Sequence, residues 1–233
     1  MRFFRNIDIE RIAEQRLAEY ESKFGEIVRP PVPIEKLVAQ VYGLTILWEK
    51  IEQGPGETVL GGLNPRNKLI ILNDACRRIF VDKPGLERST IGHEAGHWEF
   101  DVDKAALDYP RLFDDEGVVS HRRSSVLGEI EIFSGAGCLP KFLDGLAKRD
   151  TPDQERVANR FAACISLPKK LIKQAAEQYD FMRWPDLYKA AELFEVNISA
   201  LTVRLQQLGF IYIDENKQFH RSFSEAMGQR ALF

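Results

Sequence analysis

Residues 91–100 read IGHEAGHWEF, and this stretch predicts both a helix and a metal site. It places His93, Glu94 and His97 in the spacing H-E-x-x-H. On an α-helix, positions i and i+4 lie on the same face, so the two imidazoles can bind one Zn²⁺ together. Glu94 lies one step around the helix, where its carboxylate can accept a proton from a metal-bound water rather than bind the metal.

The flanks of the motif have the apolar spacing of a helix. The stripe consists of Leu86, Ile91, Ala95 and Trp98. A surface helix with two solvated histidines is the alternative interpretation, and this apolar stripe argues against it. Gly96 lies in the middle of the predicted helix, where glycine costs about 1 kcal/mol relative to alanine. We therefore expect another backbone to pass close to Gly96.

Composition limits the class of protein. With 233 residues and 44% hydrophobic content, the chain can bury a full core, either as one large domain or as a domain with a small appendage. A net charge of −3 gives no general attraction to nucleic acid or to an anionic membrane. Cys76, Cys138 and Cys164 form no C-x-x-C pair, which favours a reducing compartment. Neither a signal peptide nor a run of about 18 apolar residues is visible, so we expect a cytoplasmic protein without a membrane partner.

The first part of the chain predicts two helices and a sheet. One helix covers residues 8–24 and ends at Gly25, and a shorter one lies between Pro33 and Gly43. Three apolar runs follow, over residues 44–48, 59–63 and 69–72. The tight turn over residues 64–67 predicts a small, mostly antiparallel sheet that leads directly into the H-E-x-x-H helix. The fold class is therefore α+β.

The second part of the chain is mainly helical. Residues 101–150 show no sustained period, and we interpret them as an irregular or partly helical insertion over one side of the site. Thr151 and Pro152 begin a further helix, and Pro168 ends it. Three more helices are expected over residues 168–179, 185–194 and 199–208, followed by a short strand over 210–213.

Glu155, in the first turns of the helix after Thr151, is the preferred third metal ligand. Asn159 lies one turn later on the same face, where its amide can accept the second ring N–H of a ligand histidine. Glu129 and Glu131 are rivals because both lie closer to His97 in the sequence, although GEIEIF looks more like a strand. This helix carries small side chains at Ala158, Ala162 and Ala163, which would let it pack tightly against Gly96.

The run HEAGH and the run E-R-V-A-N-R-F-A-A-x-x-x-L-P over residues 155–168 together resemble the signature of the ImmA/IrrE metallopeptidases. The segments PPVP over residues 30–33 and RST over 88–90 are also similar to that family, as are residues 187–211. Two features depart from it. His97 and Glu155 are 155 − 97 = 58 residues apart, a long interval, and Val157 stands where the family often has an acidic residue.

The resemblance implies a zincin-like metallopeptidase domain over residues 1–167, including the 101–150 insertion. A small helix-turn-helix-like helical bundle and tail would follow over residues 168–233. It also implies His93, His97 and Glu155 as ligands of Zn²⁺, or of a similar ion such as Mn²⁺, and Glu94 as general base.

The activity implied is that of an endopeptidase acting on a protein substrate. The substrate would be a helix-turn-helix transcriptional repressor of a prophage, mobile element or stress operon. Insertion 101–150 would limit access to the site.

His121 could stabilise the oxyanion, or belong to a solvated basic turn. Gly61 and Gly62 could form a sheet edge that captures an extended substrate, or a plain strand with a bulge.

Two further alternatives remain open. Cys138 could cap the metal as a thiolate or be an ordinary core residue. The chain could also be a DNA-binding or regulatory module with a structural or degenerate metal site. However, the predicted helix over residues 199–208 carries Arg204 as its one cation, which argues against direct DNA binding.

Overall fold

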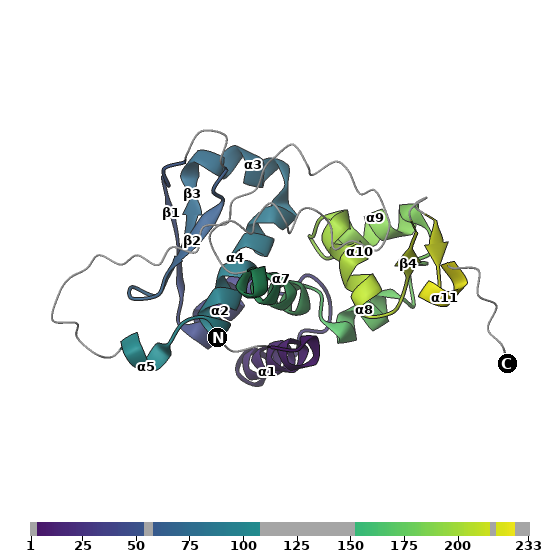
Figure 1. Ribbon diagram of the computed structural model, residues 1–233, viewed down its shortest axis with the longest axis horizontal. Helices are drawn as coiled ribbons and strands as arrows, with labels where there is room; N and C mark the ends of the chain where they lie inside the picture. The colour runs from purple at the N-terminus through teal and green to yellow at the C-terminus, as the bar shows by residue number, and fades with distance from the viewer. Residues whose placement is uncertain (1–3, 54–57, 108–151, 215–217, 227–233) are drawn as a thin grey trace.

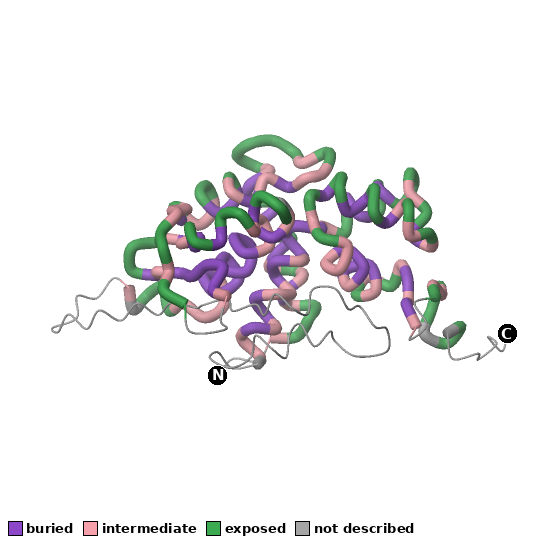
Figure 2. The backbone as a smooth tube through the Cα atoms, turned by 90° about the horizontal axis from the view of Figure 1, so that it is seen from above, coloured by how far each residue is buried: buried purple, intermediate pink, exposed green. Residues whose placement is uncertain are grey.

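Two helices from distant parts of the chain, α4 (Pro84–Phe100) and α7 (Pro152–Ser166), lie side by side at the centre of the protein (Figure 1). The structure is a computed structural model, and it describes residues 4–53, 58–107, 152–214 and 218–226. It is an α+β arrangement, as predicted, with a small sheet and helices packed around α4. Figure 2 shows the buried backbone concentrated in the middle of the molecule.

Helix α4 forms where the apolar pattern predicts it. Pro84 occupies its first turn, where the missing N–H costs nothing, and Glu87 adds a negative charge near the helix N-terminus. The predicted apolar stripe is buried, with exposed fractions of 6% or less: Leu86, Ile91, Ala95 and Trp98. Every residue from 90 to 98 is buried, so the motif lies inside the core and the surface-helix alternative is wrong.

The expected close approach at Gly96 is confirmed. A Cβ at that position would lie 2.7 Å from Ala158 Cα and 2.9 Å from Ala158 O, both of which belong to the backbone of α7. One turn earlier, a Cβ on Gly92 would lie 3.3 Å from Ala162 Cβ. Small residues on both helices therefore allow α4 and α7 to pack backbone to backbone.

The sheet is mixed, so the prediction of a mostly antiparallel sheet is wrong. Its strands are β1 (Thr45–Glu49), β2 (Gly61–Asn64) and β3 (Leu69–Asn73), in the order β1-β3-β2. The turn between β2 and β3 makes that pair antiparallel, whereas β1 pairs with the other edge of β3 in the parallel direction. A tight turn dictates only the pairing of the two strands that it joins. The place of β1 depends on which apolar face it covers.

Helix α4 packs against this sheet. A Cβ on Gly61 would lie 2.8 Å from Ile71 O and 2.9 Å from Thr90 Cγ2, so glycine is required for α4 to lie this close to β2. Between β3 and α4 the chain forms a short 3₁₀ turn, η1 (Asp74–Cys76), and helix α3 (Arg77–Asp82). The sequence predicted that the sheet leads directly into α4. This prediction is wrong, because η1 and α3 lie between them.

The helices α1 (Asn6–Phe24) and α2 (Ile34–Tyr42) agree with the predicted ones to within about two residues. Gly25 and Gly43 follow them with φ angles of 93° and 65°, which glycine adopts without the strain of a Cβ. Helix α5 (Lys104–Leu107) follows α4. Among the described residues, no helix has both the length and the apolar character needed to cross a membrane.

The C-terminal helices also follow the prediction, with a small hairpin after them. The elements are α8 (Lys169–Ala175), α9 (Trp184–Leu193), α10 (Ile198–Gln207), β4 (Tyr212–Ile213), β5 (Phe219–His220) and α11 (Phe223–Ala226). Strands β4 and β5 pair antiparallel, and the sequence predicted only the first of them. One continuous cluster of buried apolar residues joins these helices to α1, α4 and α7.

Arg204 of α10 makes a polar connection inside this core. Its side chain is fully buried and forms an ion pair with Glu10 of α1. Its Nε donates a hydrogen bond of 3.0 Å to Leu167 O, just after α7. The one cation of α10 thus joins α10 to α1 and to the end of α7.

We predict that Gly96→Ala lowers the free energy of unfolding by about 1–3 kcal/mol, because the new methyl group would meet the α7 backbone. The change should be measured by urea denaturation with a chelator present, so that metal binding does not contribute to the apparent stability. Gly92→Ala is the matched comparison and should cost less, because its neighbour is a side-chain methyl. A Gly96→Ala protein as stable as the wild type would contradict the close packing.

Candidate metal centre

His93, His97 and Glu155 converge in the core between α4 and α7. The Nε2 atoms of His93 and His97 are 3.0 Å apart. Glu155 Oε2 lies 3.4 Å from His93 Nε2, and Glu155 Oε1 lies 3.3 Å from His97 Nε2. All three residues are buried, and together they form a group that could hold a metal ion. The structure therefore brings together the three residues that the sequence selected as ligands.

The second nitrogen of each imidazole has an acceptor. His93 Nδ1 lies 3.0 Å from Asn159 Oδ1, in agreement with the role expected for Asn159. His97 Nδ1 lies 2.7 Å from Asp101 Oδ2. Asp101 was not selected from the sequence, although its position four residues after His97 places it on the same helical face, beside that ring. These acceptors hold both rings with Nε2 facing Glu155.

The donor chemistry of this group fits a cation. A carboxylate can only accept, so His97 Nδ1 carries the proton that Asp101 receives, and a neutral His97 then has a lone pair on Nε2. The same argument applies to His93 with the Asn159 oxygen as acceptor. Two lone pairs and the Glu155 carboxylate thus face one point, and Glu155 Oε2 has no hydrogen-bond partner among the described residues. Two histidines and a glutamate are a known ligand set for catalytic zinc.

The electrostatics of the site also favour positive charge. Burial alone would lower the pKa of His97, but hydrogen bonds to Asp101 and Glu155, with the charges of Glu94 and Glu155, raise that pKa to about 10. Glu94 is itself fully buried on α4, and its charge acts on His97. The carboxylates around the two rings therefore stabilise a cation at this place, whether a proton or a metal ion.

Gly61 and Gly62 lie in β2, an edge strand of the three-stranded sheet. The pairing of β2 with β3 is regular from Gly61 to Asn64, so these four residues contain no bulge, and the substrate-binding role stays a prediction. Both glycines are buried. The close contact of Gly61 with α4 gives that glycine a packing role that does not depend on any substrate.

Four candidate site residues lie outside the described residues, as does the predicted helix start at Thr151. They are His121, Glu129, Glu131 and Cys138. The rivalry of Glu129 and Glu131 with Glu155, and the proposed roles of His121 and Cys138, therefore stay predictions.

The fold and site define a class of protein: an α+β chain whose core holds a buried His-His-Glu group suited to a divalent metal. A family model, the IrrE N-terminal-like domain of the M78 peptidases, matches residues 120–206. The match supports the resemblance to the ImmA/IrrE metallopeptidases that was drawn from the two sequence runs. The matched segment contains Glu155, whereas the H-E-x-x-H helix precedes it. No curated protein matches the chain.

We predict that Glu155→Gln abolishes stoichiometric metal binding, because an amide is a far weaker ligand than a carboxylate for Zn²⁺. Metal content should be measured by mass spectrometry of the purified protein. Glu177→Gln, at an exposed position of the same residue type, is the matched control and should retain its metal. Full metal content in Glu155→Gln, with loss in Glu129→Gln or Glu131→Gln, would assign the third ligand to a rival.

Asp101→Asn should weaken metal binding by about 10–100-fold, the usual cost of losing the acceptor behind a ligand histidine. The amide keeps the size of the side chain but not the charge that makes His97 a stronger ligand. Competition with a chromogenic chelator measures the affinity. If Asp101→Asn and Asp153→Asn, the latter partly exposed in the first turn of α7, bind metal equally well, Asp101 has no such role.

Proposed function

We propose that this chain is a zinc-dependent endopeptidase in which His93, His97 and Glu155 hold the ion. The observation that carries the proposal is the convergence of these three buried groups, 3.0–3.4 Å apart, from two helices that the sequence separates widely. The match of residues 120–206 to a metallopeptidase family model supports the same activity. The ligand set favours Zn²⁺ over Mn²⁺, since imidazole suits zinc and manganese prefers oxygen ligands.

A zinc ion bound by three protein groups would lower the pKa of a water molecule to about 7 and polarise the carbonyl of the peptide bond. Glu94 supplies the base. It follows His93 directly on α4 and is fully buried, so its carboxylate acts where little solvent screens its charge. It would accept the proton of the attacking water and pass it to the departing amine nitrogen.

The other residues of the centre position these groups. Asn159 and Asp101 each accept a hydrogen bond from the Nδ1 of one imidazole, which keeps its Nε2 directed at the ligand position. Metallopeptidases also need a donor that stabilises the oxyanion, and His121 remains our candidate for it.

We propose that the substrate is an extended segment of another protein, bound along the edge of β2 beside α4. Strand addition uses main-chain hydrogen bonds and therefore suits an enzyme that must hold any extended sequence near its base. The position of β2 at the end of the sheet order supports this, because its second edge pairs with no described strand. Gly61 and Gly62 would lie under that segment. Insertion 101–150 would restrict entry to exposed loops of a specific partner.

The partner that we propose is a helix-turn-helix transcriptional repressor. This follows from the family resemblance and assigns the protein to transcription or stress regulation in the cytoplasm. We assign residues 1–167 to the zincin-like domain and 168–233 to the helix-turn-helix-like bundle. The alternative of a DNA-binding module has little support, because Arg204 is buried against Glu10 and cannot reach a phosphate.

The proposal predicts that Glu94→Gln binds metal normally but loses proteolysis by at least about 10²–10⁴ in rate, since the amide cannot accept a proton. A native extract of the source cells should be incubated with the zinc-loaded wild type or with Glu94→Gln. New protein N-termini are then mapped by mass spectrometry. We expect one or a few new termini, in exposed loops of a repressor, only with the wild type.

Two outcomes would contradict this picture. New termini produced equally by Glu94→Gln would mean that another group activates the water. Hundreds of termini across many unfolded and folded proteins would mean that access to the site is not restricted, and would remove the repressor proposal while leaving the peptidase activity intact.

A further inference from the structure

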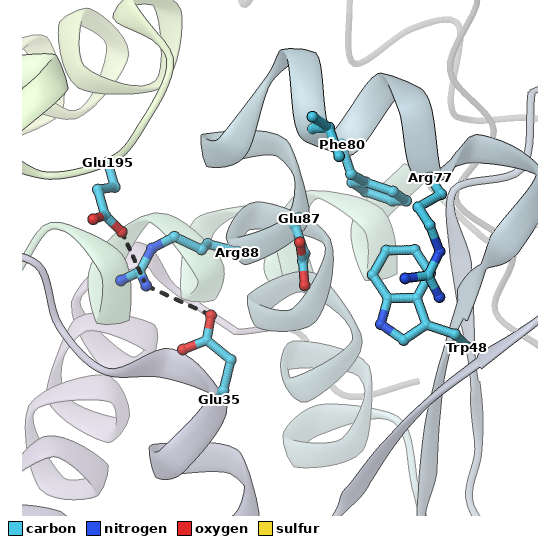
Figure 3. Close-up of a pocket in the computed structure, with 8 residues that line it drawn as sticks. Glu35, Trp48, Arg77, Phe80, Glu87, Arg88 and Glu195 are labelled. Carbon is cyan, nitrogen blue, oxygen red and sulfur yellow. Dashed lines mark ion pairs between the residues drawn. The ribbon is translucent and has the colours of Figure 1, made fainter.

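A cavity of about 400 Å³ has none of the three proposed metal ligands among its lining residues. Figure 3 shows the side chains that line it. It is formed by α2, β1, α3, the first turns of α4 and the turn between α9 and α10. Its volume is within the range of small-ligand sites. None of its lining residues has a role in the proposed peptidase centre.

One side of this cavity is ionic, although the buried Arg88 Nε has no hydrogen-bond partner among the described residues. Arg88 Nη1 lies 3.5 Å from Glu35 Oε1 and 3.5 Å from Glu195 Oε2, and Arg88 also donates to Val32 O. Figure 3 shows Arg88 between the two glutamates. The two carboxylates beside Arg88 balance its positive charge and so weaken its attraction for an anionic ligand.

The opposite side is aromatic. Trp48 and Phe80 pack edge to face with ring centroids 5.4 Å apart. The Arg77 guanidinium lies 4.3 Å from the centroid of the Trp48 ring, and its Nε pairs with Asp74 Oδ1 at 2.8 Å. The indole thus already accommodates a planar cation on its face, held by a carboxylate.

Glu87 lies between these two sides (Figure 3). In the described part of the chain, no cation lies within ion-pair distance of it, unlike Glu35 and Glu195. Burial and the charge of Glu35 raise the pKa of Glu87, and the charges of Arg77 and Arg88 oppose this only in part. A ligand that brings positive charge to Glu87 would relieve both the desolvation and the repulsion.

We propose that this cavity binds a guanidinium group on an apolar stem, as in an arginine side chain. Its N–H donors would bind the Glu87 carboxylate, and its stem would lie against Trp48 and Phe80. A guanidinium is favoured over an ammonium because its planar pair of N–H donors matches the two oxygens of the Glu87 carboxylate. The inference rests on this cavity alone and does not require the peptidase activity.

Isothermal titration calorimetry of the full-length, metal-loaded protein tests the proposal. N-acetylarginine amide is the probe, and N-acetylcitrulline amide is its uncharged isostere. We expect binding of the arginine compound with a dissociation constant in the millimolar range or below, and at least about tenfold weaker binding of the citrulline compound. Agmatine tests whether the natural ligand is a free small molecule or an arginine of a peptide. If agmatine binds more tightly than N-acetylarginine amide, the ligand is a free small molecule, and if it binds more weakly, the ligand is a peptide.

The matched variants are Glu87→Gln and Glu177→Gln, both of which remove one carboxylate charge. Glu87→Gln should weaken binding of N-acetylarginine amide at least about tenfold, whereas Glu177→Gln should leave it unchanged. Equal metal content and far-ultraviolet circular dichroism confirm that both variants are folded. Equal affinity for arginine and citrulline, equal binding by Glu87→Gln and wild type, or no binding to the wild type at millimolar concentration would each overturn the proposal.

Discussion

The candidate site depends on the contact between Gly96 of α4 and the backbone of Ala158 in α7. Helices usually pack with their axes 8–10 Å apart, and small residues at a crossing allow the closest approach. This approach brings Glu155, three residues before Ala158, to within 3.4 Å of the Nε2 atoms of His93 and His97. A larger side chain at position 96 would separate the two helices and, with them, the three proposed ligands. The close packing of α4 on α7 is therefore also what brings the three proposed ligands together.

That constraint has an electrostatic consequence. Two imidazole nitrogens and a carboxylate, all buried and directed at one point, form an unfavourable arrangement unless a cation lies among them. Asp101 and Asn159 each accept a hydrogen bond from the Nδ1 of one imidazole, which leaves the lone pair of its Nε2 directed at Glu155. This arrangement makes a cation at that point more favourable. Metal binding should then contribute directly to the stability of the α4–α7 core, since the unfolded chain has no such arranged site. Glu94, the base that we propose, is fully buried beside this group.

The C-terminal helices are part of the same body. Arg204 of α10 is buried against Glu10 of α1 and donates to Leu167 O at the end of α7. Because breaking a buried ion pair leaves an uncompensated charge, this connection is costly to separate. At the other side, Glu195 reaches Arg88 on α4, and the guanidinium-binding cavity that we propose lies at this junction. Both connections link the helical bundle to the helices that carry the proposed ligands.

Much of the site was predictable from the sequence alone, because its signals are local. The i, i+4 histidines, the apolar stripe of α4, and the proline and glycine residues at helix ends all follow from the geometry of one helix. The role of Asp101 as acceptor for His97 could also have been predicted, because it lies four residues after His97 on the same helical face. From the sequence, Glu155 was preferred over Glu129 and Glu131 only because it lies on a predicted helix with Asn159 on the same face. Other features depend on segments that meet only in three dimensions. The parallel pairing of β1 with β3, the packing reason for Gly61, the burial of Arg204 and the cavity around Glu87 were decided by the tertiary structure, because each depends on which distant surface covers it.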